Sequence, residues 1–122
     1  MRVGVSPLQE RQLSVYYCNN YPYAKCHPIF DGINYLYGVS GQPVNGPGPG
    51  NCGQVSCSWN SAIWWCNDNP TTYALGSFGD IANLASDVVQ KCSYCNAGAY
   101  FPVAGQQFTD QDWNVIVRDG SC

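Results

Sequence analysis

The most regular pattern of apolar and polar positions in the chain runs from Ser77 to Cys95. Apolar residues recur there at the i, i+3, i+4, i+7 spacing that lines one face of a helix: Ile81, Leu84, Ala85, Val88 and Cys92. The run opens with Ser77-Phe78-Gly79-Asp80, a capping-box pattern whose side chains can satisfy amides at a helix start. One further turn of the same face reaches Cys95. We therefore predict an amphipathic helix that carries Cys92 and Cys95 into the core.

Weaker patterns predict the other elements. A shorter helix is expected from Cys26, because Pro28 suits a first turn and an apolar stripe follows at Ile29, Phe30, Ile33, Leu36 and Tyr37. Segments rich in β-forming residues predict strands at 13–18, 55–59, 62–66, 100–103 and 112–118. The second and third of these are joined by a tight turn at Asn60-Ser61 or form one bulged strand. Without βαβ regularity, these elements predict an α+β fold with helices packed on a mainly antiparallel sheet.

Two segments are predicted to lack regular structure. The loop from Gly41 to Gly50 is rich in glycine and proline. We interpret it as a tolerated long connection (slack in the chain) in preference to a functional loop. Residues 1–12 are polar and free of cysteine, which predicts a disordered arm or a propeptide remnant before a single domain of residues 13–122. The same residues lack the apolar core of a signal peptide.

The cysteine content places the chain among extracellular proteins. Eight cysteines in 122 residues predict a disulfide scaffold with no free thiol, and hence a secreted protein. Zinc is the alternative, since Cys92 and Cys95 have knuckle-like spacing. However, the gap between Cys52 and Cys57 is loose and the one histidine, His27, directly follows Cys26. We therefore expect neither a metal nor a cofactor.

Charge and hydropathy exclude two classes of partner. The formal net charge of -3 and only five basic residues argue against nucleic acid, because too few phosphates could be neutralised. No apolar run is long enough to span a membrane.

Candidate chemistry is sparse. His27 lies in a cramped turn, no unpaired cysteine is expected beside it, and the aspartates fall mostly in turns and caps: Asp31, Asp68, Asp80, Asp110, Asp112 and Asp119. We therefore predict a protein that is not an enzyme. The tryptophans, Trp59, Trp64, Trp65 and Trp113, could stack on sugars, but adjacent Trp64 and Trp65 must point to opposite faces of a strand, and core packing is the ordinary role.

The second half of the chain resembles the type-four killer toxin family and the small cysteine-rich elicitors of filamentous plant pathogens. The resemblance lies in the order of Cys57, Asn60, Ser61 and Ile63, an amphipathic helix through Ala82 to Leu84, the pair Cys92 and Cys95, and a last strand, Trp113 to Val117, before Cys122. It covers about the last 70 residues. The resemblance implies a small secreted α/β-sandwich, and for this chain we expect a disulfide-stapled sandwich whose mainly antiparallel sheet has two helices packed on one face.

The resemblance also implies a disulfide pattern that spacing cannot give, since eight cysteines allow 105 pairings. It pairs Cys18 with Cys92, Cys26 with Cys95, Cys52 with Cys66 and Cys57 with Cys122.

The function implied is that of a secreted fungal effector or elicitor, acting in the apoplast, that binds a plant or microbial surface protein and triggers host cell death. Alternatives are a growth inhibitor of competing fungi directed at an ion channel and a binder of wall polysaccharide. The killer toxins carry a lysine just before the cysteine matched to Cys57, whereas Gly53 to Ser56 contain no cation. For a monomeric protein of this kind, we expect partner contacts at Trp64, Trp65, Asn67, Asp68 and Tyr73, because aromatic side chains concentrate binding energy.

Overall fold

The core of the fold is a five-stranded antiparallel sheet. The computed structural model describes residues 15–93, 95 and 102–122. In spatial order the strands are β1 (Tyr16–Cys18), β8 (Gly105–Phe108), β9 (Trp113–Asp119), β5 (Ser61–Asn67) and β4 (Asn51–Ser58). Two short pairs accompany it: β2 (Ala24–Lys25) with β7 (Pro102–Val103), and β3 (Val44–Asn45) with β6 (Tyr73–Ala74).

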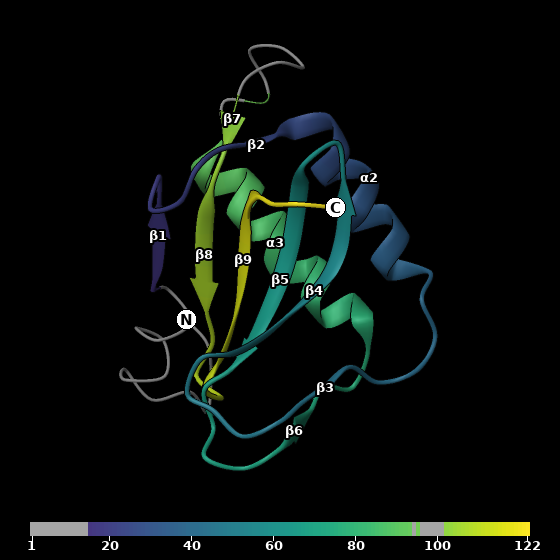
Figure 1. Cartoon of the computed structure of the whole chain (residues 1–122), viewed down its shortest axis with the longest axis vertical. Coiled ribbons are helices and arrows are strands. Elements are labelled where there is room, and N and C mark those ends of the chain that lie inside the picture. Colours follow the sequence, from purple (N-terminus) through teal and green to yellow (C-terminus); the bar gives the residue numbers. More distant parts are fainter. Residues whose placement is uncertain (1–14, 94, 96–101) are drawn as a thin grey trace, which may run out of the picture.

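Two helices cover one face of this sheet and leave the other face toward the viewer in Figure 1. Helix α2 (Cys26–Tyr37) packs on β4 and β5, and helix α3 (Phe78–Cys92) packs on β1, β8 and β9. The core between these layers contains fully buried side chains from both helices and the two central strands, among them Leu36, Ile63, Ile81, Val88 and Val115. The predicted α+β fold with two helices on one face of a mainly antiparallel sheet is confirmed.

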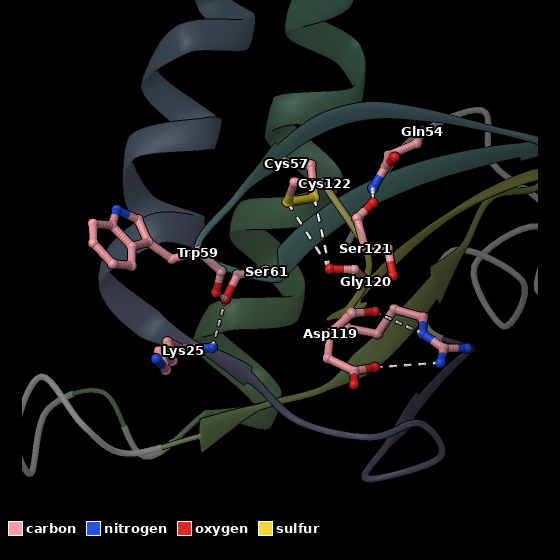
Figure 2. The surroundings of a disulfide bond; sticks show 10 residues. Lys25, Gln54, Cys57, Trp59, Ser61, Asp119, Gly120, Ser121 and Cys122 are labelled. Atoms are coloured by element: carbon pink, nitrogen blue, oxygen red, sulfur yellow. Dashed lines mark hydrogen bonds and ion pairs between the residues drawn. A yellow bond between two sulfur atoms is a disulfide. The ribbon is translucent and has the colours of Figure 1, made fainter.

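Four disulfides staple these layers. They join Cys18 to Cys92, Cys26 to Cys95, Cys52 to Cys66 and Cys57 to Cys122, the same four pairs that the resemblance implies. The first two tie the segment around β1 and the start of α2 to the end of α3. The third joins facing residues of β4 and β5, and the fourth fastens the segment after β9 to β4. Figure 2 shows this last bond beside the amide of Gln54, which donates to the Ser121 carbonyl over 3.5 Å.

The major helix ends earlier than its pattern predicts. Helix α3 stops at Cys92 because Ser93 is extended, with φ -115° and ψ 160°, and forms a β-bridge with Val103. Cys95 therefore reaches its partner from outside the helix. At the other end Ser77 is the N-cap, but its hydroxyl makes no capping bond, so the predicted capping box does not form.

The shorter helix has the predicted bounds, but part of its predicted apolar stripe is exposed. The side chains of Phe30 and Tyr37 lie outside the core, whereas Gly32 is buried. A Cβ atom at Gly32 would lie 2.4 Å from the Ser56 hydroxyl and 3.2 Å from Cδ1 of Ile63. The glycine that lowers helix propensity is therefore the residue that lets α2 approach β4.

We expect Gly32→Ala to destabilise the protein by about 1–2 kcal/mol, because crowding the α2–β4 contact outweighs the gain in helix propensity. Chemical denaturation of the variant measures the change. Adding Ser56→Ala removes the nearest atom and should restore part of the loss. A Gly32→Ala protein more stable than the parent would contradict this account of the contact.

The β4–β5 hairpin turns one residue earlier than predicted, at Trp59-Asn60, with φ values of 50° and 55°. Two consecutive residues with positive φ are the signature of a type I′ turn, which favours Asn-Gly. Asparagine tolerates this conformation, but in a tryptophan it is an outlier that costs roughly 1–2 kcal/mol. Trp59 is also the most exposed large apolar residue in the described chain, with 77% of its surface accessible.

Some elements were not predicted from sequence. Strand β8 has the polar sequence Gly-Gln-Gln-Phe and shows no alternation of apolar residues. The 41–50 loop, expected to be irregular, contains the two-residue strand β3. The predicted arm at residues 1–12 lies outside the described residues.

Candidate functional site

The sheet separates the residues expected to contact a partner. Trp65 is 1% exposed and packs edge-on against Trp113 in the core, with ring centroids 6.2 Å apart. Asn67 is fully buried. Trp64, the residue before Trp65, points to the opposite face, as the alternation of a strand requires. Of the expected residues on β5, only Trp64 therefore lies on the face that no described helix covers, which we call the outer face.

Two adjoining hollows lie on this outer face. The larger has a volume of about 460 Å³ and lies between Tyr21, Phe108, Ile116 and the loop residues Pro49 and Gly50. The smaller, of about 260 Å³, is lined by Trp64, Ile116, Arg118 and the segment after β9. Ile116 and Cys52 line both, so the two hollows share a wall made by an aliphatic side chain and a disulfide. We define the outer-face site as these two hollows.

A chain of hydrogen bonds runs along the larger hollow in one direction. The Tyr21 hydroxyl donates to Oε1 of Gln106 (3.4 Å), Nε2 of Gln106 donates to Oδ1 of Asn114 (2.8 Å), and Nδ2 of Asn114 donates to Oδ2 of Asp68 (2.8 Å). Because both Asp68 oxygens accept hydrogen bonds, the carboxylate fixes the orientation of the two amides. Gln106 and Asp68 are half-buried and Asn114 is buried, so the site holds polar groups in a fixed orientation beside apolar surface.

Asp68, the second expected residue found in this site, is held in place by the loop opposite. Its Oδ1 accepts from the amide of Gly50 over 2.8 Å, and this bond draws the 41–50 loop to the edge of the larger hollow. Pro49 and Gly50 of this loop therefore line the larger hollow. Tyr73, by contrast, lies in β6, where its hydroxyl is 3.5 Å from Oε1 of Gln111.

Asn67 positions the site from beneath. Its Nδ2 donates to the carbonyls of Gly46 (2.8 Å) and Thr71 (2.9 Å), and its Oδ1 accepts from the backbone and side-chain nitrogens of Asn69 (2.9 and 3.1 Å). One buried amide thus joins the two loops that frame Asp68. It is a structural residue, and its side chain does not reach the surface.

The described cations are not gathered into one exposed basic cluster. Arg118 lies over the Tyr21 ring at 4.9 Å and pairs with Asp119 at 3.3 Å. Lys91 donates to Gln107 over 2.8 Å and lies over the Tyr16 ring at 4.6 Å. Both charges are engaged within the fold, and the third described cation, Lys25, is exposed on β2.

Other chemistry receives little support from the described residues. They contain no group of three or more His, Cys, Asp or Glu side chains placed to hold a metal ion. Neither described helix is long and apolar enough to cross a membrane.

Sequence reasoning missed most of the outer-face site. Its residues come from three separate parts of the chain: Tyr21, Gln106 on the strand that showed no pattern, and the pair Asn114 and Ile116 on β9. The one available signal was the alternation in the last strand, which assigns Asn114, Ile116 and Arg118 to a common face. Comparisons with known proteins found no matching family model, no matching curated protein and no matching solved structure.

Proposed function

We propose that this protein is a secreted fungal effector that binds an extracellular target through its outer-face site, without catalysing a reaction. The four disulfides are typical of a small extracellular protein, which supports the coarse part of this proposal. The observation that carries it is the outer-face site itself, where a directional chain of side-chain hydrogen bonds runs beside Tyr21, Phe108 and Ile116 on the sheet face that no described helix covers.

Pre-oriented polar groups beside apolar surface are the ordinary composition of a binding site. The target we favour is a surface protein of a plant host, with cell death or defence as the response. The elicitor resemblance supports this choice. A channel-directed killer toxin is less well supported, because Lys91 and Arg118 are engaged within the fold and β4 carries no cation.

A cell-wall polysaccharide is the second candidate target. The half-buried Asp68 and Gln106 can exchange hydrogen bonds with hydroxyl groups, and the rings of Tyr21 and Phe108 can pack on apolar sugar faces. The same site serves either target, so the two candidates differ in the ligand and share the residues.

Infiltration of the oxidised protein into leaves, with the same batch applied to fungal spores, tests the proposal. The variant Tyr21→Ala/Phe108→Ala removes two rings from the site, and we expect it to need about tenfold more protein for the same cell death. Tyr37→Ala is the matched control, since Tyr37 is an exposed aromatic on the helical layer, hydrogen-bonded to Asn83. It should act like the parent.

Three results would redirect or overturn the proposal. Inhibition of spore growth without a leaf response would favour a channel-directed toxin over an effector. Silence in both assays, with retention on insoluble glucan or chitin that the double variant loses, would favour the polysaccharide. Equal activity of the parent and the double variant in every assay would remove the outer-face site from the function.

A further inference from the structure

A second surface of the molecule has the features of a recognition site. Strand β4 is eight residues long, and in the described part of the chain it pairs only with β5. Its other edge therefore presents backbone N–H and C=O groups with no described strand beside them. Natural proteins protect such an edge with charged residues, proline or a β-bulge; β4 contains no charged residue and no proline, and its bulge lies between Gln54 and Ser56.

A groove of about 450 Å³ runs along this edge, between β4 and α2. Asp31 and Tyr35 line it from the helix, and Val55, Ser56 and Ser58 line it from the strand. Gly32, where α2 closely approaches Ser56 of β4, also lines the groove. A bulge between Gln54 and Ser56 interrupts the edge, so only a short partner segment can pair without a break.

The groove carries one charge. Asp31 is the only charged residue among the described residues that line it, and its side chain is 67% exposed. Nε2 of His27, which is charged only if protonated, lies 3.9 Å from its Oδ2. The complementary ligand is therefore cationic. The chain's formal net charge of -3 favours the same sign of partner.

Trp59 directly follows the last residue of β4 at one end of the groove. Figure 2 shows its ring projecting from the hairpin turn, on the side away from the bond between Cys57 and Cys122. A large aromatic side chain held at a positive φ and left exposed is unfavourable for the isolated protein. Exposed tryptophans are also the commonest anchors of protein interfaces, which gives this residue a role that the fold alone does not supply.

We propose that the groove between β4 and α2 binds a short extended polypeptide segment carrying a lysine or arginine. The segment adds to the free edge of β4 as a further strand, its cation pairs with Asp31, and an apolar side chain contacts Trp59. Backbone hydrogen bonds supply affinity in this mode of recognition, while alternate side chains supply specificity. This surface is separate from the outer-face rings, so failure of either proposal leaves the other in place.

The test uses the oxidised protein and synthetic probes. The first probe is a labelled short peptide of alternating threonine and valine with one central lysine. The second has glutamate in place of the lysine, and the third carries N-methyl groups on alternate backbone nitrogens. We expect the lysine peptide to bind saturably in fluorescence polarisation, and the other two to bind at least about fivefold more weakly.

Two variants separate recognition from folding. Asp31→Asn should weaken binding of the lysine peptide about threefold and should not weaken binding of the glutamate peptide. Asp87→Asn, a carboxylate change on α3, should leave the binding of both peptides unchanged. Trp59→Asn places at the turn a residue that tolerates positive φ. This variant should raise the midpoint of unfolding while weakening binding of the lysine peptide about tenfold. A residue with a purely structural role could not give higher stability and lower affinity together.

Amide chemical shifts locate the bound probe. The proposal expects changes confined to residues 31–35 and 54–59. Changes on the outer face, equal binding of the lysine and glutamate peptides, or an unaltered affinity in Trp59→Asn would overturn it. So would concentration-dependent dimerisation that buries the same edge and excludes the peptide, because the occupant would then be a second copy of the chain.

Discussion

Excess reductant is expected to unfold this protein at neutral pH and room temperature. Three of the four disulfides join residues 74, 69 and 65 positions apart. In the chain-entropy model a disulfide that closes a loop of this length stabilises the folded state by about 4 kcal/mol. Even half of the summed contribution of the three bonds matches the free energy of unfolding of a small domain. Near-UV circular dichroism before and after reduction measures the effect, with far-UV spectra showing whether helices survive.

The four bonds should not contribute equally. Cys52 and Cys66 are 14 positions apart and face each other in strands that already pair, so we expect the double variant Cys52→Ser/Cys66→Ser to lose the least stability. The corresponding Cys18→Ser/Cys92→Ser variant, which frees β1 from α3, should lose the most or fail to fold. A reduced protein that keeps its near-UV signal would show that the core suffices without bridges.

Replacing Asn67 with alanine is expected to cost about 3–5 kcal/mol, the largest effect of any single non-cysteine substitution considered. The side chain is fully buried, and its loss leaves the carbonyls of Gly46 and Thr71 and the amide of Asn69 without their partner. Each unsatisfied group costs about 1–3 kcal/mol where water cannot reach it. Chemical denaturation of the oxidised protein gives the value.

The matched control is Asn83→Ala, since Asn83 is an exposed asparagine on α3 that accepts one hydrogen bond, from the Tyr37 hydroxyl. That change should stay within about 0.5 kcal/mol. Because Asn67 joins the loops on either side of Asp68, the Asn67→Ala protein should also lose activity at the outer-face site under conditions where it remains folded. A loss of stability no larger than that of the control would show that these loops do not depend on Asn67.

The elements that the sequence predicted are those whose signal is local. Both helices follow from apolar spacing within 15 residues or fewer, and β9 follows from the alternation of Trp113, Val115 and Val117 with Asn114, Ile116 and Arg118. Each helix packs one side against the sheet, and Trp113, Val115 and Val117 of β9 belong to the core, whereas Asn114 and Ile116 are buried on the other side of the strand. The end of α3 was misplaced since a long-range partner, Val103, draws Ser93 into an extended bridge.

What the sequence could not show depends on partners far along the chain. Strand β8 exists because β1 and β9 pair on either side of it, and its buried Gln107 is accommodated by Lys91 and by the carbonyl of Val15, to which Gln107 donates. The outer-face site has the same origin. Asp68 and Asn114 look like ordinary turn and strand residues until β5 and β9 align, and single-residue propensities carry no trace of that alignment.

The arrangement of the bridges has a consequence for survival among extracellular proteases. The disulfide between Cys18 and Cys92 closes a ring that contains residues 18–92, and the disulfide between Cys57 and Cys122 closes a ring that contains residues 57–122. The two rings overlap. Any single peptide bond cut between Cys18 and Cys122 therefore lies inside at least one closed ring. A protease that nicks the glycine-rich loop or the hairpin tip would open the backbone there without releasing a fragment.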